Sequence, residues 1–319
     1  RRLRATLLAR SAPDEALALL DEATPFPGAS LLRGVALEAA GRLDEAIEAN
    51  QRATLEAPSS ARAFTNLGNA LRKQRRHEEA EPALRRALEL DPDDVFAWNA
   101  LGLLRRSTGD RDGARAAFER AMQLRPDYAP PAYNLGNLLL AAGDPQGAIP
   151  AFELAVKADP ADVRALCNLG DACMRTGAVQ RALPIFVKAA ELAPDDLIPH
   201  YNLGRAALER ELHETALAAA RRADALDRRG YHGAFVLAEA LLAQPQVDAA
   251  AALAAARLAE QRGGRAPAVR WTLVRALVAA GERDEAWALL ERARAEGWFE
   301  AEPERSSAER LRAELRPSR

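Results

Sequence analysis

Two consecutive stretches decide the fold: residues 129–162, APPAYNLGNLLLAAGDPQGAIPAFELAVKADPAD, and residues 163–196, VRALCNLGDACMRTGAVQRALPIFVKAAELAPDD. They align place for place over 34 residues, with Asn-Leu-Gly at places six to eight, Ala at place 20 and Pro at place 32 of each. Self-similarity at a fixed period is the signature of a repeat architecture, and a period of this length indicates stacked supersecondary units.

The same spacing extends over most of the chain. One glycine, two alanines and one proline recur every 34 residues: Gly34, Gly68, Gly102, Gly136, Gly170 and Gly204; Ala46, Ala80, Ala114, Ala148, Ala182, Ala216 and Ala250; Ala53, Ala87, Ala121, Ala155, Ala189 and Ala223; Pro58, Pro92, Pro126, Pro160 and Pro194. With 19 glycines among 319 residues, such a series in register does not arise by chance.

Each unit is predicted to form two helices separated by a break such as Thr108-Gly109-Asp110. The recurring Gly and Ala are small, which predicts that the two helices cross closely at these points. A bulky residue midway along the second helix then fills the remaining space: Leu84, Phe118, Phe152 or Phe186. Proline cannot continue a helix and ends each unit. The pattern predicts an all-α solenoid, because one hairpin alone cannot bury its apolar face.

The unit resembles the tetratricopeptide repeat family. Leu67-Gly68, Ala80, Leu84, Ala87 and Pro92 stand where that family has its Leu-Gly, Ala, bulky apolar residue, Ala and Pro, with Phe64 or Trp98 as the large residue before them. The resemblance covers nearly the whole chain, is clearest over 61–196, and implies a right-handed superhelical solenoid of helix-turn-helix repeats. The series of asparagines described below also resembles the repeat domain of O-linked N-acetylglucosamine transferases.

We predict one repeat domain over 1–319, made of a degenerate N-terminal hairpin (1–26), six regular repeats (27–230), two divergent repeats (231–298) and a C-terminal capping helix (299–319) with a capping box at Ser306 and Glu309. In the divergent part Arg257 replaces the second alanine. We expect Gly263-Gly264 to shift the register by two residues.

Composition excludes several functions. Lys plus Arg total 44 against 46 Asp plus Glu, so the overall charge does not favour nucleic acid or an anionic membrane. There is no run of eighteen apolar residues and therefore no predicted membrane span. Alanine-rich, Arg-over-Lys composition suggests a bacterial source. The scarcity of cysteine suggests the reducing cytoplasm, although the start at Arg1, without Met, suggests a trimmed piece from which a signal peptide or a fused domain could have been removed.

No catalytic motif, cofactor site or metal site is predicted. His77, His200, His213 and His232 lack metal-ligand spacing, and Cys167 and Cys173 lie on different faces of one helix, where they suit a structural role. The sequence Asp110-Arg111-Asp112-Gly113 is interpreted as a turn rather than a calcium loop. We therefore expect that this segment is not an enzyme.

A peptide-binding stripe is predicted on the first helices, which line the concave face in this family. Counting places from residues 27, 61, 95, 129, 163 and 197, the sixth place holds Asn66, Asn134, Asn168 and Asn202, and the ninth holds Asn69 and Asn137. An asparagine can donate to and accept from a peptide backbone. The alternative is that these asparagines make structural hydrogen bonds within or between repeats.

Charged and aromatic residues complete the stripe. Its front is basic, with Arg62, Arg72, Lys73 and Arg106; further along come Tyr133, Tyr201, Phe235 and Trp271, with Arg164, Arg175 and Arg205 among them. Aromatics and Arg dominate binding hot spots; alternatively the rings belong to the core and the charges to a solvated face. The carboxylate clamp of heat-shock cochaperones is rejected: Asn137 and Asn168 match it, but Tyr133 and Ile198 replace its lysines and Asn202 a further basic residue.

The sequence thus predicts an interaction scaffold that binds a protein or peptide, acidic or extended, in its groove. One alternative is the substrate-recruiting part of a larger enzyme, such as a glycosyltransferase, sulfotransferase or kinase. Another is a structural protein that self-associates through its ends. No nucleic acid is expected as the main partner.

Overall fold

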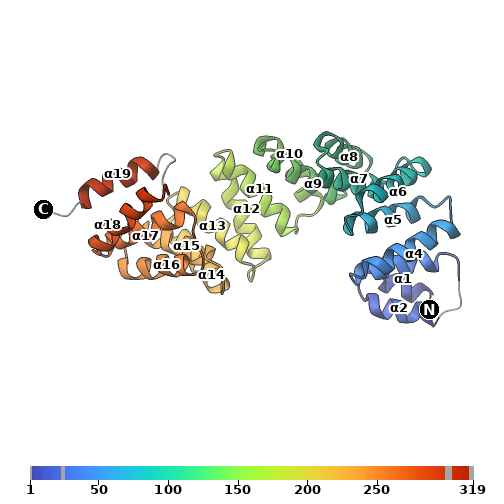
Figure 1. The fold of residues 1–319 in the computed structure, drawn as a ribbon, viewed down its shortest axis with the longest axis horizontal. Helices are drawn as coiled ribbons and strands as arrows, with labels where there is room; N and C mark the ends of the chain where they lie inside the picture. The colour runs from blue at the N-terminus through green and yellow to red at the C-terminus, as the bar shows by residue number, and fades with distance from the viewer. Residues whose placement is uncertain (1, 23–25, 299–303, 316–319) are drawn as a thin grey trace. The chain divides into compact units, whose positions relative to one another are not determined.

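The computed structural model describes residues 2–22, 26–298 and 304–315, and all the secondary structure it defines there is helical. The chain forms two compact units, Arg1–Pro160 and Ala161–Arg319. Within each unit consecutive helices pair as hairpins that stack on the next hairpin (Figure 1). The predicted all-α hairpin solenoid is therefore confirmed, whereas the single repeat domain with its internal boundaries stays a prediction.

Unit 1 holds the first ten helices: α1 (Arg2–Leu8), α2 (Pro13–Asp21), α3 (Ala29–Ala39), α4 (Leu43–Glu56), α5 (Ala61–Lys73), α6 (His77–Leu90), α7 (Val95–Thr108), α8 (Arg111–Leu124), α9 (Ala129–Ala141) and α10 (Pro145–Ala158).

Unit 2 holds the remaining helices: α11 (Val163–Arg175), α12 (Val179–Leu192), α13 (Leu197–Glu209), α14 (His213–Leu226), α15 (His232–Leu242), α16 (Ala249–Gln261), α17 (Pro267–Ala279), α18 (Arg283–Ala295) and α19 (Glu304–Leu315).

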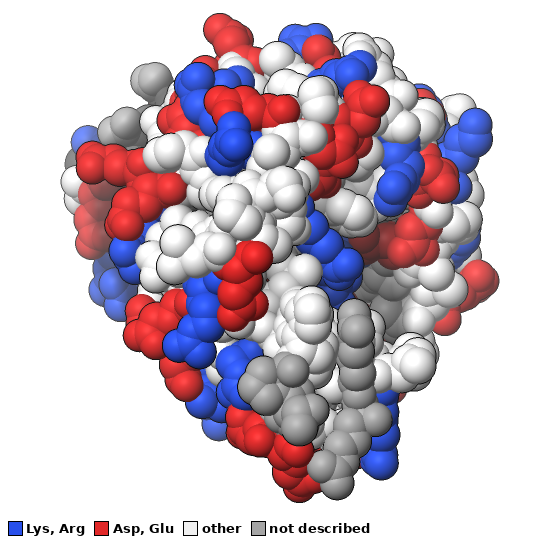
Figure 2. All heavy atoms as spheres, turned by 90° about the vertical axis from the view of Figure 1, so that its right-hand side faces the viewer, with Lys and Arg blue, Asp and Glu red and all other residues white. Residues whose placement is uncertain are grey.

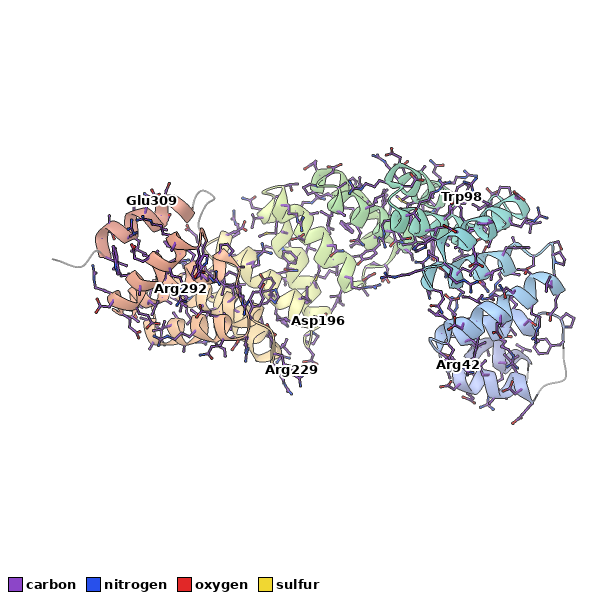
Figure 3. The ribbon with its side chains drawn as sticks, in the orientation of Figure 1. Arg42, Trp98, Asp196, Arg229, Arg292 and Glu309 are labelled. Atoms are coloured by element: carbon purple, nitrogen blue, oxygen red, sulfur yellow. The ribbon has the colours of Figure 1, made fainter. Side chains whose placement is uncertain are left out.

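Short polar residues start many of these helices. Asp94 accepts hydrogen bonds from the backbone N–H of Phe96 and Ala97, and Asp196, labelled in Figure 3, accepts one from Ile198 at 3.0 Å. Asp110 accepts from Gly113 N at 2.9 Å. The Asp-Arg-Asp-Gly motif is therefore the N-cap and first turn of α8 and not the turn that the sequence predicted.

Close glycine–aromatic contacts lie between the two helices of three regular hairpins. A Cβ added at Gly102 would lie 2.5 Å from the ring of Phe118, and the corresponding distances are 2.6 Å for Gly136 and Phe152 and 2.4 Å for Gly170 and Phe186. All three rings are buried. The predicted reason for the recurring glycine is thus confirmed, because only a residue without a side chain leaves room for the ring.

Two hairpins fill this space differently. In the α3–α4 hairpin Asn50 takes the place of the bulky apolar residue and is fully buried against Gly34. In the α13–α14 hairpin the corresponding residue is Ala220, and the contact nearest to Gly204 comes instead from Val236 of the next first helix, 3.1 Å from an added Cβ. A neighbouring repeat therefore supplies the volume that α14 lacks.

The predicted register of the divergent repeats is wrong in one detail. The buried alanines of α16 each lie 36 residues after a buried alanine of α14, whereas Ala250 is exposed: Ala252, Ala255, Ala256 and Ala259 follow Ala216, Ala219, Ala220 and Ala223. The two extra residues therefore lie in the turn between α15 and α16, not at Gly263-Gly264. A run of consecutive alanines in α16 concealed this shift, since several registers place an alanine at the small position.

The C-terminal helix also differs from the prediction. It begins at Glu304, so Ser306 lies inside the helix and cannot be its N-cap, because Glu304 and Arg305 are themselves good helix formers. Ala308 and Leu315 are buried, and Arg312 pairs with Glu291 of α18. The first five residues of the predicted cap, 299–303, lie outside the described residues.

Candidate functional site

A groove of about 700 Å³ lies within unit 1, and four of the predicted binding residues line it: Arg62, Asn66, Asn69 and Arg72. These residues occupy places 2, 6, 9 and 12 of their repeat, which share one face of α5. The facing wall comes from α7, from the Asp91–Asp94 link before it and from Tyr128. Arg10, in the turn between α1 and α2, also reaches the groove.

The floor of the groove is held by contacts between first helices. Thr65 donates to Asp94 Oδ2 at 2.7 Å, while the other oxygen of Asp94 caps α7. Trp98, labelled in Figure 3, donates its indole N–H to Pro92 O at 2.8 Å. The link between α6 and α7 is therefore fixed in place next to the groove.

A polar network connects α3 to α5. Asn69 donates to Glu38 Oε1 at 3.2 Å and accepts from Arg72 at 2.8 Å, while Lys73 pairs with Glu38 at 2.8 Å. Burial lowers the pKa of the Arg72 guanidinium; Glu38 raises it and the nearby Arg106 lowers it further. Asn69 and Lys73 are thus engaged within the protein, and Arg72 is a partly buried charge.

The predicted asparagine ladder is in part structural. Asn134 donates to Asn99 Oδ1 at 2.9 Å, and Asn202 hydrogen-bonds the Cys167 thiol. In both pairs the sixth place of one repeat contacts the fifth place of the repeat before it. The alternative interpretation is confirmed for these two asparagines. Asn99 was not part of the predicted ladder, because it stands at the fifth place of its repeat and not at the sixth or ninth.

Asn66 breaks this pattern. The fifth place of the preceding repeat is Leu31, which offers no acceptor. The amide nitrogen of Asn66 is buried and has no hydrogen-bond partner among the described residues, although the residue lines the groove. An unpaired buried amide donor costs free energy unless a ligand accepts its hydrogen bond.

Aromatic residues that the sequence reasoning missed lie at the edge of the groove. Phe96, 47% exposed, meets Tyr128 edge-to-face with 5.2 Å between ring centroids, and the Arg125 guanidinium lies 5.5 Å from the Phe96 ring centroid. Burial raises the pKa of Tyr128, against the opposing charges of Arg10 and Arg125. Phe96 stands at the second place and Tyr128 at the last, outside the fifth-place strip that the sequence suggested.

The predicted aromatic strip is mostly packed. Tyr133 meets the buried Phe152 edge-to-face at 6.1 Å, and Phe235 and Trp271 pack against core clusters of unit 2. Tyr201 also packs against the core but remains partly exposed, with Arg205 5.7 Å and His232 5.5 Å from its ring. The strip is therefore not a continuous exposed surface in either unit.

The other predicted residues do not line the groove. Arg164 lies near Asp162 at 3.4 Å and Arg175 pairs with Asp171 at 2.7 Å, both exposed on α11, whereas Asn137 and Asn168 are partly buried on α9 and α11. Arg106 is exposed on α7, near Arg72.

Within the described residues no group of three or more His, Cys, Asp or Glu side chains could hold a metal ion. Cys167 and Cys173 are buried free thiols, and burial raises the pKa of Cys167 to about 11. No described helix has the length and apolar composition needed to cross a bilayer.

Comparison with known proteins agrees with the helical hairpins. The family model of the tetratricopeptide domain of cytochrome c-type biogenesis protein H matches residues 60–196, and a second tetratricopeptide model matches residues 3–61. The chain contains tetratricopeptide repeats. The resemblance to the repeats of O-linked N-acetylglucosamine transferases stays a prediction.

Solved tetratricopeptide structures share the fold. YrrB is 25% identical over 59% of this chain and 96% of its own, with a TM-score of 0.51. PilF of Pseudomonas aeruginosa is 19% identical over 65% of this chain and 94% of its own, with a TM-score of 0.57. The Cut9–Hcn1 structure matches 99% of this chain and 62% of its own at 16% identity, with a TM-score of 0.56. No curated protein sequence matches the chain.

Proposed function

We propose that this protein is an interaction scaffold and that the groove of unit 1 binds an extended segment of a partner protein. Tetratricopeptide proteins generally mediate protein interactions, and YrrB is described as having an unusual peptide-binding site. The observation that carries the proposal is the buried, unpaired amide of Asn66 in a groove of about 700 Å³, a volume typical of ligand sites.

The groove offers what an extended peptide needs. Asn66 can donate to a backbone carbonyl, and the Phe96–Tyr128 pair presents a partly exposed aromatic edge for an apolar side chain. Asn66 and Phe96 lie on helices and Tyr128 is the N-cap of α9, so the peptide would meet a preorganised surface, which lowers the cost of binding. This role requires no catalysis by the chain itself.

Site-specific photo-crosslinking tests the proposal. We would replace Phe96 by the photoreactive p-benzoyl-phenylalanine and irradiate the protein in a lysate of the source organism. The matched control carries the same group at Arg85, an exposed residue of α6. We expect partner peptides to be captured from position 96 and lost when Asn66→Leu is added. Equal capture from both positions would contradict the assignment of the groove as the binding site. If capture from position 96 is unchanged by Asn66→Leu, the Asn66 amide does not contribute to binding.

The remaining sequence hypotheses keep their own tests. Self-association through the ends of the solenoid would appear as a concentration-dependent mass in light scattering. A role as the recruiting part of a larger enzyme, and the cytoplasmic location, stay predictions.

A further inference from the structure

Several arginines of unit 1 pair with a carboxylate, as in Arg76–Glu79, Arg85–Glu81 and Arg115–Glu119 on or next to the second helices. Arg10, Arg62, Arg72 and Arg125 of the groove, by contrast, form no ion pair with the described carboxylates. These basic side chains, which come from both walls and from the α1–α2 turn, are therefore uncompensated where a ligand would lie.

The acidic residues of the groove are already engaged. Asp94 caps α7 and accepts from Thr65, Asp93 pairs with Arg120 at 2.9 Å, and Asp91 accepts from the N–H of Asp93. None of them neutralises the groove arginines. Their charges also disfavour a continuous polyanion such as nucleic acid, which would pass close to all three.

Arg72 is the most constrained of these cations. Within the described part of the chain, its hydrogen bonds run from Nε and one terminal nitrogen to Asn69, a neutral acceptor, while Glu38 is bound by Asn69 and Lys73. Arg106 adds a like charge beside it. A partly buried cation with a cationic neighbour is stabilised most by an external anion that accepts from its free terminal nitrogen.

We infer that the groove selects an acidic segment of its partner protein, with an oxyanion held by Arg72 and an apolar side chain of the same segment on the Phe96–Tyr128 edge. This inference rests on the proposed function. The oxyanion is a single, local requirement, because acidic and basic side chains are interspersed over the surface in Figure 2 and the net charge is −2. A glutamate or aspartate carboxylate and a phosphoserine share this chemistry.

Fluorescence anisotropy with three labelled probes tests the inference. The probes are short peptides that differ only in carrying glutamate, phosphoserine or glutamine beside a leucine. At low salt we expect the glutamate probe to bind about tenfold more tightly than the glutamine probe, because only the former can form charge-assisted hydrogen bonds. A further gain for phosphoserine would identify a phosphorylated partner, and equal binding of the two anionic probes would identify a carboxylate.

Matched variants locate the effect. Arg72→Gln is expected to weaken binding of the glutamate probe by about tenfold and to leave the glutamine probe unchanged, since it removes only the charge-assisted bond. Arg72→Lys keeps the positive charge but loses the planar guanidinium with its paired donors. Its affinity for the glutamate probe should lie between those of the parent protein and Arg72→Gln. Arg85→Gln, which makes the same charge change on α6, should have no effect. Circular dichroism of each variant confirms that the fold is kept.

Two results would overturn the inference without touching the proposed function. Equal affinity for the glutamate and glutamine probes would mean that the groove binds peptide without reading charge. If no probe binds, acidic recognition is wrong, and the crosslinking from position 96 still decides whether the groove binds a partner. Loss of binding in Arg85→Gln as large as in Arg72→Gln would likewise overturn it, because the attraction would then belong to the whole surface.

Discussion

The role of an asparagine in this chain depends on the residue that the preceding repeat places beside it. Asn134 hydrogen-bonds Asn99 and Asn202 hydrogen-bonds Cys167, so their amides join neighbouring first helices. For Asn66 the fifth place of the preceding repeat is Leu31, which offers no acceptor, and the Asn66 amide nitrogen has no partner among the described residues. The sequence predicted the series but could not assign these roles, because the partner of each amide stands one place earlier in a different repeat.

Asn50 gives a stability prediction at the scale of one residue. It is fully buried, and neither amide atom has a hydrogen-bond partner among the described residues. Leu84 occupies the corresponding position two helices later. Asn50→Leu should raise the free energy of unfolding by about 1–3 kcal/mol, because an unsatisfied polar group is replaced by an apolar one of similar size. Urea denaturation measures the change, and Leu84→Asn should lower stability. A less stable Asn50→Leu variant would show that the amide is in fact satisfied.

Cys167 gives a pH prediction. Burial raises its pKa from 9.0 to about 11, with a smaller contribution from Asp196 and an opposing hydrogen bond from Asn202. The unfolded thiol therefore loses its proton at lower pH than the folded one. The stabilisation is complete below pH 9 and is lost as the pH rises toward 11.

The measurement is the free energy of unfolding across this range, with Cys167→Ala as the reference. The difference in the free energy of unfolding between the parent protein and Cys167→Ala should narrow or reverse above pH 9. At neutral pH the folded thiol should react slowly with a disulfide reagent and quickly once unfolded. Rapid reaction of the folded protein at neutral pH would contradict the raised pKa.

At the scale of the helical element, the cost of adding a side chain to the first helix depends on what the second helix presents. Gly170 faces the ring of Phe186 at 2.4 Å from an added Cβ, whereas Gly204 faces Val236 at 3.1 Å and otherwise backbone at 3.7 Å or more. Both glycines stand at the eighth place of their repeats, so they form a matched pair.

Gly170→Ala should therefore destabilise the protein by about 1–3 kcal/mol through overpacking. Gly204→Ala should cost less than about 1 kcal/mol or be stabilising, because the gain in helix propensity offsets a milder contact. Thermal unfolding of the two variants beside the parent protein checks the order. The same loss in both would show that the glycines serve backbone geometry and not the packing of the second helix.

The register of α16 shows where sequence reasoning stops. Glycine, phenylalanine and proline are distinctive enough to fix the hairpins from 61 to 196, and the structure confirms those contacts. In α16 the alanines are too numerous to mark one register, so Ala250 was assigned the place that Ala252 holds. The groove was harder still. Its Arg10 and Tyr128 stand far apart in the sequence, and no periodicity relates them.

The corrected register predicts where the chain tolerates shortening. Pro245 and Gln246 are exposed in the longer α15–α16 turn, whereas Gly264 is buried and an added Cβ there would lie 2.8 Å from Ala259 O. Removing residues 245–246 should change the free energy of unfolding by less than about 1 kcal/mol, since turn length is a weak determinant of stability. Removing Gly263-Gly264 should destabilise clearly more, as measured by urea denaturation. The opposite order would restore the register that the sequence suggested.

At the scale of the whole molecule, stability is expected to be local. Helices contact their neighbours in sequence, so the free energy of unfolding is approximately a sum over hairpins and their interfaces. In hydrogen exchange, Gly170→Ala should speed amide exchange in α11 and α12 of unit 2 and leave α3 to α6 of unit 1 unchanged. Uniform acceleration across both units would show that the chain unfolds as one cooperative body.

The glycine–phenylalanine contact lies inside each hairpin, while the asparagine contacts join one hairpin to the next. A chimera cut at the prolines therefore carries its tight steric fit intact, while the apolar and polar contacts between neighbouring hairpins must re-form at the junction. A chimera cut at the glycine turns must instead fit a phenylalanine ring from one parent against the first-helix backbone of the other parent. Recombination and gene duplication would accordingly accept whole 34-residue cassettes, so the protein can change length or exchange the groove of unit 1 while keeping the packing inside each hairpin.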